Sequence, residues 1–383
     1  MTRNEFLPLS RPYIGEEEIN EVVKTLLTGW WTTGPKVFEF EHQLSSYLSN
    51  KETLFTAALN SCTSAMFLAL KALNINEGDE IIVPTWTFAA TSQIVEWVNA
   101  KPILCDIEGE SLSIDIEKAE KLITNKTKAI IPVHIAGYPC DIDKIEDLAR
   151  HHNLKVIEDA AHAIGTKYKG IKIGNFSDVT CFSFYATKNL AMGEGGAIVS
   201  KNHDLIEKIK KISYFGINKK ANLNNVKNRT WAYDIEEIGY KCNLDSMHAA
   251  LGLVQLQKLD EMNSRRREIA QIYKQHLNPL ISFTKDSEDH FHIYHLFPIL
   301  LPDNIDRDEF ICQLSQRKIG SGIHFVPLHK HSYYNERFSG NHFPVANRLF
   351  ERILSIPMFP SMTNEEVHYV IDSINDILRK TYG

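Results

Sequence analysis

Between about residue 54 and residue 200, short apolar runs rich in β-branched residues alternate with amphipathic stretches such as Ser61–Leu73 and Ile142–His151. Strands that alternate with helices form βαβ units, which build a mainly parallel sheet. Several runs are almost continuously apolar, as expected when helices cover both faces of the sheet. We therefore predict an α/β domain. The predicted strands are Glu80–Pro84, Pro102–Asp106, Ala129–His134, Lys155–Asp159, Val179–Phe184 and Gly196–Ser200.

The pattern changes after Asn243. Residues 246–277 are predicted to form one long helix, followed by a strand-like HIYHLFPIL and a helix from about Arg307. A second strand-like stretch, GIHFVPL, and a final helix after Thr363 complete the chain. This layout predicts a smaller α+β domain over residues 246–383, after a large domain over residues 1–245. The polar stretch Asn218–Arg229 has no apolar face and is predicted to be a mobile loop.

Composition excludes several classes of protein. Asp and Glu number 48 against 42 Lys and Arg, so the formal charge is −6, which disfavours a binder of nucleic acid or of a membrane surface. The chain shows no signal peptide and no apolar stretch long enough to span a bilayer. Its six scattered cysteines include no C-x-x-C pair, which argues against a disulfide framework and a zinc site. We expect a cytoplasmic protein that binds no metal.

The stretch from Val156 to Ser200 carries the clearest chemical signal. One predicted strand ends in Asp159, and the next runs through Ser183 toward Lys188 and the small-residue segment MGEGGA. Ligands gather at the carboxyl ends of parallel strands. Pyridoxal 5'-phosphate (PLP) needs a lysine for its Schiff base and a carboxylate that keeps its pyridine nitrogen protonated. Alone, Asp159 could be a helix cap and Lys188 a solvated side chain, but together they predict a PLP site. The chain lacks the glycine motifs of dinucleotide and P-loop sites.

Sequence blocks across nearly the whole chain resemble the DegT/DnrJ/StrS-type nucleotide-sugar aminotransferases. The blocks include TGWWTTGPKVFEFE, NSCTSAMFLAL, EDAAHAIGT, SFYATKNLAMGEGGA, GYKCN and IGSGIHFVPLHKHSYY. The resemblance implies the aspartate-aminotransferase-like fold, PLP fold type I. It also implies Lys188 as the Schiff-base lysine and Asp159 as the partner of the pyridine nitrogen. The same resemblance places His162 near the phenolic oxygen of PLP and Ser183 at its phosphate.

Further residues match family positions around the cofactor. Cys62 and Thr63 lie at a turn where the family has S-G-T and where a helix N-terminus holds the phosphate. Cys62 replaces the usual glycine, so this turn must tolerate a side chain. Phe88 matches the ring that stacks on the pyridine, and Trp86 is its rival, two residues away. Either ring could instead be plain core packing.

A second group of residues matches family positions at the cofactor phosphate of the neighbouring subunit or nearer the substrate. Asn243, and Lys241 beside it, match a segment that reaches the PLP phosphate of the neighbouring subunit, although a domain-boundary turn is the simpler alternative. This match implies a homodimer with shared active sites. Trp31, His324 and His329 belong to blocks on the substrate side.

The resemblance also implies a reaction. Glutamate would donate its amino group, and a nucleotide-linked keto sugar would accept it. Some relatives that dehydrate sugars have histidine where this chain has Lys188, which favours transamination here. The subset of motifs points to a UDP-linked 4-keto sugar and to a product for lipopolysaccharide or another surface glycan. The alternatives are a PLP enzyme that acts on a keto-cyclitol or dehydrates a sugar, and a catalytically silent PLP-binding regulator.

Overall fold

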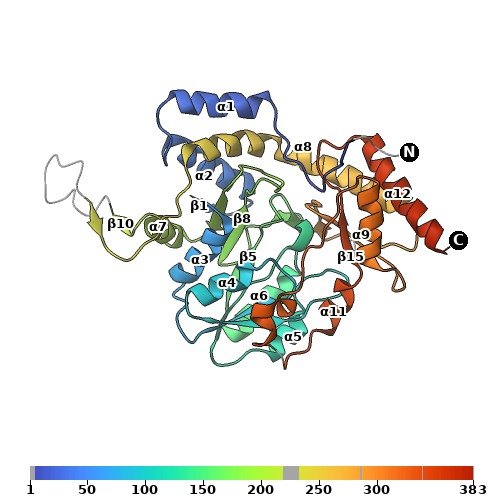
Figure 1. The fold of residues 1–383 in the computed structure, drawn as a ribbon. Helices are drawn as coiled ribbons and strands as arrows, with labels where there is room; N and C mark the ends of the chain where they lie inside the picture. The colour runs from blue at the N-terminus through green and yellow to red at the C-terminus, as the bar shows by residue number, and fades with distance from the viewer. Residues whose placement is uncertain (1–4, 219–232, 285–286, 339, 383) are drawn as a thin grey trace.

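The structure is a computed structural model that describes residues 5–218, 233–284, 287–338 and 340–382. The predicted polar loop Asn218–Arg229 lies outside these residues except for Asn218. A seven-stranded sheet forms the centre of the molecule, in the order β1-β9-β8-β5-β4-β2-β3 (Figure 1). Its strands are β1 (Phe55–Leu59), β2 (Glu80–Pro84), β3 (Lys101–Cys105), β4 (Thr127–Ile130), β5 (Lys155–Asp159), β8 (Val179–Ser183) and β9 (Gly196–Ser200).

The sheet is mainly parallel, as predicted. The neighbours β3, β2, β4, β5 and β8 pair in parallel, whereas β9 runs antiparallel to both β8 and β1. The carboxyl ends of β1, β5 and β8 and the amino end of β9 therefore meet at one edge. The six predicted strands are confirmed with ends shifted by up to four residues, and β1 is a strand that the prediction missed.

Helices cover both faces of the sheet because alternate strand residues point to opposite sides. Ile81 and Val83 of β2 belong to one buried cluster, packed with α3, α4 and α7, while Ile82 belongs to another, packed with α5 and α6. Helices α2 and α8 pack on the sheet around β1, β8 and β9. The bounds are α2 (Pro35–Leu48), α3 (Cys62–Ala72), α4 (Ala90–Trp97), α5 (Ile116–Lys121), α6 (Ile142–His152), α7 (His203–Ile212) and α8 (Ser246–His276).

The long helix α8 links the sheet to the C-terminal region. Asp245 caps its first turn by accepting hydrogen bonds from the N–H groups of Met247 and His248. Beyond α8, the short strands β12 (Ser282–Phe283), β14 (Phe297–Leu300) and β15 (Ile353–Ile356) form an antiparallel sheet. The helices of this region are α9 (Arg307–Gln316), α10 (Ser332–Asn335), α11 (Pro344–Phe350) and α12 (Asn364–Tyr382).

Two strand predictions in this region are wrong in extent. Only Phe297–Leu300 of HIYHLFPIL is a strand of this sheet. GIHFVPL forms no strand: Gly322 makes one isolated bridge to Ser355, and a 3-10 turn follows at Leu328–Lys330. The division into domains at residue 245 stays a prediction. The N-terminal segment does pack in the C-terminal region, since Leu7 pairs with Ile319 and lies in the same buried cluster as α9 and α12.

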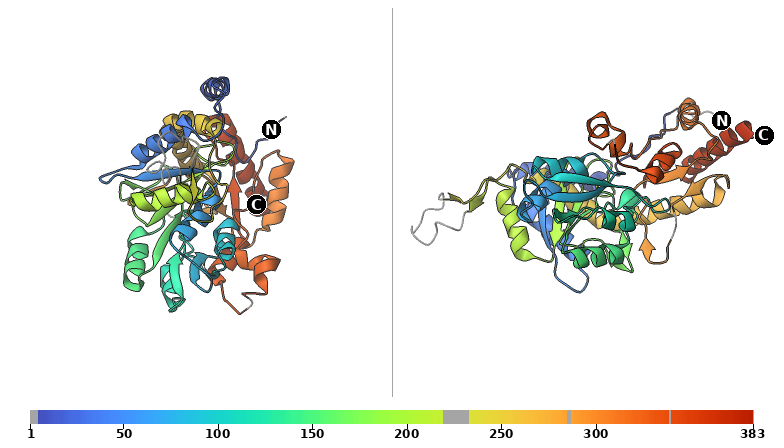
Figure 2. Two further views of the ribbon diagram at one scale, coloured as in Figure 1. Left: turned by 90° about the vertical axis from the view of Figure 1, so that its left-hand side faces the viewer. Right: turned by 90° about the horizontal axis from the view of Figure 1, so that it is seen from below.

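Peripheral elements complete the fold. Helix α1 (Glu16–Leu27) packs along α8 at the outside of the molecule, where Figure 2 shows it end-on. The ribbon of β10 (Ile217–Asn218) and β11 (Asp234–Ile235) projects from the side opposite the two termini (Figures 1 and 2). Strands β6 (Lys167–Tyr168), β7 (Ile171–Lys172) and β13 (His290–Phe291) form a third small sheet. None of the helices in the described part of the chain is long and apolar enough to cross a membrane.

Candidate active site

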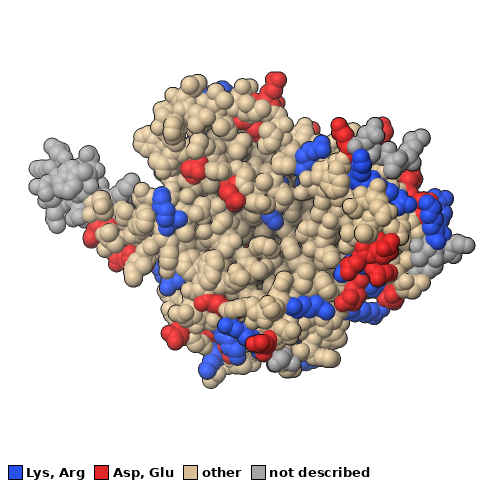
Figure 3. Space-filling model, in the orientation of Figure 1, with Lys and Arg blue, Asp and Glu red and all other residues tan. Residues whose placement is uncertain are grey.

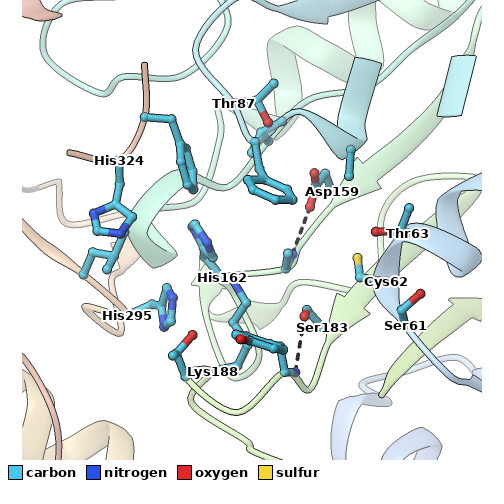
Figure 4. Close-up of a pocket in the computed structure, with 18 of the residues that line it drawn as sticks. Ser61, Cys62, Thr63, Thr87, Asp159, His162, Ser183, Lys188, His295 and His324 are labelled. Atoms are coloured by element: carbon cyan, nitrogen blue, oxygen red, sulfur yellow. Dashed lines mark hydrogen bonds between the residues drawn. The ribbon is translucent and has the colours of Figure 1, made fainter. Parts of the chain in front are cut away.

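A cavity of about 570 Å³ opens at the sheet edge where β1, β5 and β8 end. Asp159, the last residue of β5, and Ser183, the last residue of β8, both line it. Figure 4 shows histidines on one side of this cavity and the start of α3 on the other. The volume suits a small organic cofactor or substrate. Cavity lining includes most of the residues that the sequence singled out: Cys62, Thr63, Phe88, Asp159, His162, Ser183, Lys188 and His324.

Asp159 presents a buried carboxylate to this cavity. Its side chain accepts hydrogen bonds from the Thr91 hydroxyl at 2.8 Å and from the Ala161 N–H at 3.1 Å. Burial raises the pKa of the Asp159 carboxyl, and these two hydrogen bonds together with the charge of Lys188 partly offset that shift. A buried carboxylate of this kind gains stability in its charged form from a cationic partner. The cavity can therefore hold a ligand with a protonated ring nitrogen at this point.

Lys188 lies on the loop that joins β8 to β9. The loop folds back on itself, with hydrogen bonds from the Met192 N–H to the Phe184 carbonyl and from the Ala186 N–H to the Gly193 carbonyl. Burial lowers the pKa of the Lys188 amine to about 8, although Asp159 and Cys62 act in the opposite direction. At neutral pH a useful fraction of this amine is thus uncharged and can attack an aldehyde carbon.

The first turn of α3 forms a second wall of the cavity. Ser61 caps the helix by accepting a hydrogen bond from the Ser64 N–H, and Cys62 and Thr63 follow at the cavity. N–H groups in a first helical turn have no partner within the helix, so they can bind an anion. Gly196 of β9 lies directly against this turn: a Cβ built on it would be 2.3 Å from the Ser61 carbonyl carbon. Glycine is required there for close backbone approach.

The structure separates the two aromatic candidates. The Phe88 ring lines the cavity and is 60% exposed, so one of its faces is open to a ligand. Trp86 is fully buried, does not line the cavity, and donates its indole N–H to the His324 carbonyl at 3.0 Å. Trp86 is a packing residue that joins the β2 end to the segment around His324, and Phe88 is the ring that can stack on a cofactor.

His162 is held in one tautomer. Its Nδ1 accepts a hydrogen bond from the Ala136 N–H at 3.2 Å, so the ring proton is on Nε2. Burial, with the nearby Lys188 and His324, lowers the pKa of His162 well below its usual value. The ring is therefore neutral and can donate from Nε2. His324 also lines the cavity, and its Nδ1 lies 3.1 Å from the Ser355 hydroxyl.

Four predicted residues do not line this cavity. His329 joins two regions: one ring nitrogen lies 2.7 Å from the Thr85 hydroxyl and the other 2.9 Å from the Asn347 side-chain oxygen. The other three lie together outside the cavity lining, where the Asn243 amide donates to the Thr33 hydroxyl and the exposed Lys241 amine donates to Asn243. Trp31 is two residues before Thr33 and half exposed.

Sequence reasoning missed other residues of the cavity. Thr87 and His295 line it, and Thr91, which does not line it, donates a hydrogen bond to the Asp159 carboxylate. Both threonines lie within the block GDEIIVPTWTFAAT, shortly after the predicted strand Glu80–Pro84, and that position at the carboxyl end of a strand could have indicated them. His295 lies in a stretch predicted to be a strand, where nothing in the local pattern points to an active site.

Residues 12–375 match the DegT/DnrJ/EryC1/StrS aminotransferase family. The chain belongs to this family. It is 43% identical to the spore coat polysaccharide biosynthesis protein SpsC of Bacillus subtilis, over 98% of both chains.

Solved structures agree with this assignment. Spr1654 from Streptococcus pneumoniae in its PMP form has a TM-score of 0.91 at 32% identity, covering 98% of this chain and 99% of that one. The same protein has a PLP form. The sugar aminotransferase CalS13 from Micromonospora echinospora has a TM-score of 0.88 at 25% identity, covering 97% of this chain and 99% of that one. The fold is therefore PLP fold type I, and the protein is a PLP-dependent sugar aminotransferase.

Proposed function

We propose that this enzyme transfers an amino group from glutamate to a UDP-linked 4-keto sugar, for the synthesis of a surface glycan such as lipopolysaccharide. The observation that carries the catalytic part is the cavity that joins a buried carboxylate, Asp159, to a lysine of lowered pKa, Lys188. The nucleotide, the keto position and the amino donor are supported by the motif resemblance across the chain. The likeness to SpsC, a spore coat polysaccharide biosynthesis protein, supports the glycan role.

In this proposal the two residues divide the proton chemistry. Bound PLP supplies an electron sink for the negative charge that develops at the substrate carbon. The Asp159 carboxylate holds a proton on the pyridine nitrogen by charge pairing. Lys188 carries the cofactor between turnovers. Once free, its amine removes the proton from the α-carbon of the donor and returns a proton to the cofactor side.

Other cavity residues suit the remaining parts of the cofactor. The first turn of α3, with Cys62 and Thr63, and the Ser183 hydroxyl can bind the phosphate. The open face of Phe88 can stack on the pyridine ring. The Nε2–H of neutral His162 can donate to the phenolic oxygen. His324 stays as the substrate-side residue within the cavity.

We further propose a homodimer in which each active site uses residues of both chains. Trp31, Lys241 and Asn243 match substrate and phosphate positions but lie outside the cavity of their own chain, so they can serve the partner's cavity. Helix α1 offers an apolar surface for such a partner. Ile19, Val23 and Leu27 are spaced four residues apart and are 56%, 47% and 82% exposed. Figure 3 shows few charged side chains over α1 and the middle of that face.

One assay tests the substrate and the mechanism together. The purified enzyme would be incubated with PLP, glutamate and each of several UDP-, dTDP- and GDP-linked 3-keto and 4-keto sugars, with products identified by mass spectrometry. We expect amination of a UDP-linked 4-keto sugar. Lys188→Ala should abolish turnover, and the exposed Lys155→Ala should not. Amination of 3-keto sugars alone would overturn the substrate proposal, and wild-type rates in Lys188→Ala would overturn the mechanism.

Mixed dimers test the shared site. Lys188→Ala chains and Lys241→Ala/Asn243→Ala chains would each be inactive alone. Refolded together, they should recover about a quarter of the wild-type activity, because half of the dimers are mixed and each mixed dimer has one intact site. No recovery from chains shown to exchange would mean that each cavity works within one chain.

A further inference from the structure

The loop that carries Lys188 is hydrogen-bonded to α8 at two points. One residue after Lys188, the Asn189 side chain donates its amide N–H to the Asn263 oxygen at 2.6 Å. Three residues after Lys188, the backbone N–H of Ala191 donates to the side-chain oxygen of Gln255 at 3.3 Å. Gln255 and Asn263 are separated by about two helical turns, so they lie on one face of α8. Both residues are buried.

The contact between Asn189 and Asn263 has a fixed orientation. Asn263 donates its amide N–H to the Ile164 carbonyl at 3.1 Å, and a carbonyl can only accept. The Asn263 oxygen therefore accepts from Asn189, and the Asn189 oxygen accepts from Nδ1–H of His295 at 2.8 Å. This contact links the Lys188 loop to groups around the cavity itself.

The contact through Gln255 instead links the loop to α1, which lies alongside α8 (Figure 1). Gln255 donates its amide N–H groups to the Tyr13 carbonyl and to the Glu18 carboxylate, both at 2.8 Å. Neither acceptor can donate, so the Gln255 amide cannot be turned round, and its oxygen faces Ala191. Among the described residues, this oxygen is the only acceptor of the Ala191 N–H.

Glu18 is buried between the two helices and keeps its charge there. Its carboxylate also accepts from the Gly15 N–H at 2.8 Å and from the Lys258 amine at 3.0 Å. Burial raises the pKa of this carboxyl, but these hydrogen bonds and the one from Gln255 hold it below its usual value. At neutral pH Glu18 is therefore an anion that only accepts, and it fixes the orientation of Gln255.

We propose that Gln255 is a positioning residue for Lys188, and that it holds the lysine loop in place relative to the first turn of α1. The inference rests on the proposed role of Lys188. Gln255 does not line the cavity, so it acts through the Ala191 N–H. Loss of this bond leaves a buried N–H without an acceptor, and the loop must shift to satisfy it. The Lys188 amine then moves away from the position in which it attacks the cofactor aldehyde.

Gln255→Met tests this role, because methionine has nearly the shape of glutamine but its thioether is only a weak acceptor. Gln257→Met is the matched control. Gln257 lies two residues further along α8, is exposed, and makes no hydrogen bond within the part of the chain that the structure describes. Urea unfolding of both variants checks that they fold.

Two forms of the cofactor separate the position of the lysine from the shape of the cavity. PLP has an aldehyde that links to Lys188, and absorbance follows the rate of this linkage in the full-length, cofactor-free protein. Pyridoxamine 5'-phosphate (PMP) has an amine there and cannot link, so its affinity, measured by calorimetry, reports the rest of the cavity. We expect Gln255→Met to slow the linkage by about tenfold, since a displacement of about 1 Å can cost about 100-fold. The PMP affinity should stay at the wild-type value.

A second substitution tests the path through α1. Glu18→Ala removes an acceptor that orients Gln255 but leaves Gln255 in place, so it should slow the linkage in the same way. In the Gln255→Met background, Glu18→Ala should have no further effect on the linkage rate, because its path to the Lys188 loop passes through Gln255. The lost contacts to Gly15 and Lys258 should appear in urea unfolding in both backgrounds.

The outcomes separate the positioning role from a purely structural one. Slower linkage with unchanged PMP affinity in Gln255→Met supports the proposal. A wild-type linkage rate overturns it, as does an equal loss of PMP affinity, which would show that Gln255 only supports the fold. Further slowing by Glu18→Ala in the double variant would overturn the path through α1. Linkage in Lys188→Ala would refute the role of Lys188 itself, whatever Gln255 does.

Discussion

Replacing Gly196 by alanine should disable the cofactor site through backbone displacement alone. The new Cβ would be 2.3 Å from the Ser61 carbonyl carbon and 2.4 Å from the Cys62 nitrogen, both of them backbone atoms. Carbon atoms in contact prefer about 3.5–4.0 Å, so strand and helix must separate by about 1 Å. No flexible side chain can absorb this shift. Gly196 also pairs with Leu59 of β1 and Ser183 of β8, so the displacement reaches both of these strands.

The expected cost has two parts. Overpacking between rigid backbones should lower the free energy of unfolding by about 3 kcal/mol. A shift of about 1 Å would also break or lengthen the hydrogen bonds that the first turn of α3 offers to the phosphate. Losing one or two such charged contacts should weaken PLP binding by about 100-fold, or about 2.7 kcal/mol.

Urea unfolding of the cofactor-free protein and fluorescence titration with PLP measure the two parts separately. Gly109→Ala is a matched control, because its Cβ would meet only the Val345 side chain at 3.6 Å, an ordinary contact. We expect the control to behave as wild type. If Gly196→Ala also kept the wild-type unfolding midpoint and PLP affinity, the inferred close approach of β9 and α3 would be wrong.

Other predictions concern Asp159, the buried histidines and Asp106. Thr91→Val removes a hydrogen bond to the Asp159 carboxylate, so the pKa of Asp159 should rise further and the acidic limb of the kcat/KM profile should move up by about one pH unit. Burial lowers the pKa of His324 to about 4 and that of His162 and His295 well below the usual value. Below about pH 6.5 the unfolded chain therefore binds protons that the folded chain does not bind. The urea concentration at the unfolding midpoint of the cofactor-free protein should decrease as the pH is lowered from about 6.5 to about 4. A midpoint that did not change over this range would contradict the prediction. Asp106→Ala leaves the Val345 and Ala346 N–H groups at the start of α11 and the Lys118 amine without their buried acceptor, so it should cost about 2–4 kcal/mol in urea unfolding.

The sequence by itself predicted the sheet and the two residues that we propose as the centre of the site. Strand and helix periods are local properties, so alternating runs between residues 54 and 200 were enough to predict a parallel sheet. Parallel strands end at the same edge, so Asp159 and the loop that carries Lys188 had to come close. This reasoning needs only strand direction, not side-chain packing.

Tertiary structure decided between residues that sequence periodicity cannot distinguish. Trp86 and Phe88 are two residues apart and equivalent in an extended strand, and only packing against the His324 segment buries one and exposes the other. GIHFVPL has the composition of a strand but pairs at Gly322 alone, because other strands complete the small sheet.

The same reason explains why the sequence did not single out His295, which lines the cavity. The position of its ring proton depends on Asn189, Asn263 and Ile164, which are distant in sequence. Hydrogen-bond direction passes through space from one polar group to the next, so no local pattern encodes it. The chain therefore predicts the lysine of the proposed site, while the position of the ring proton on His295 follows only from the folded structure.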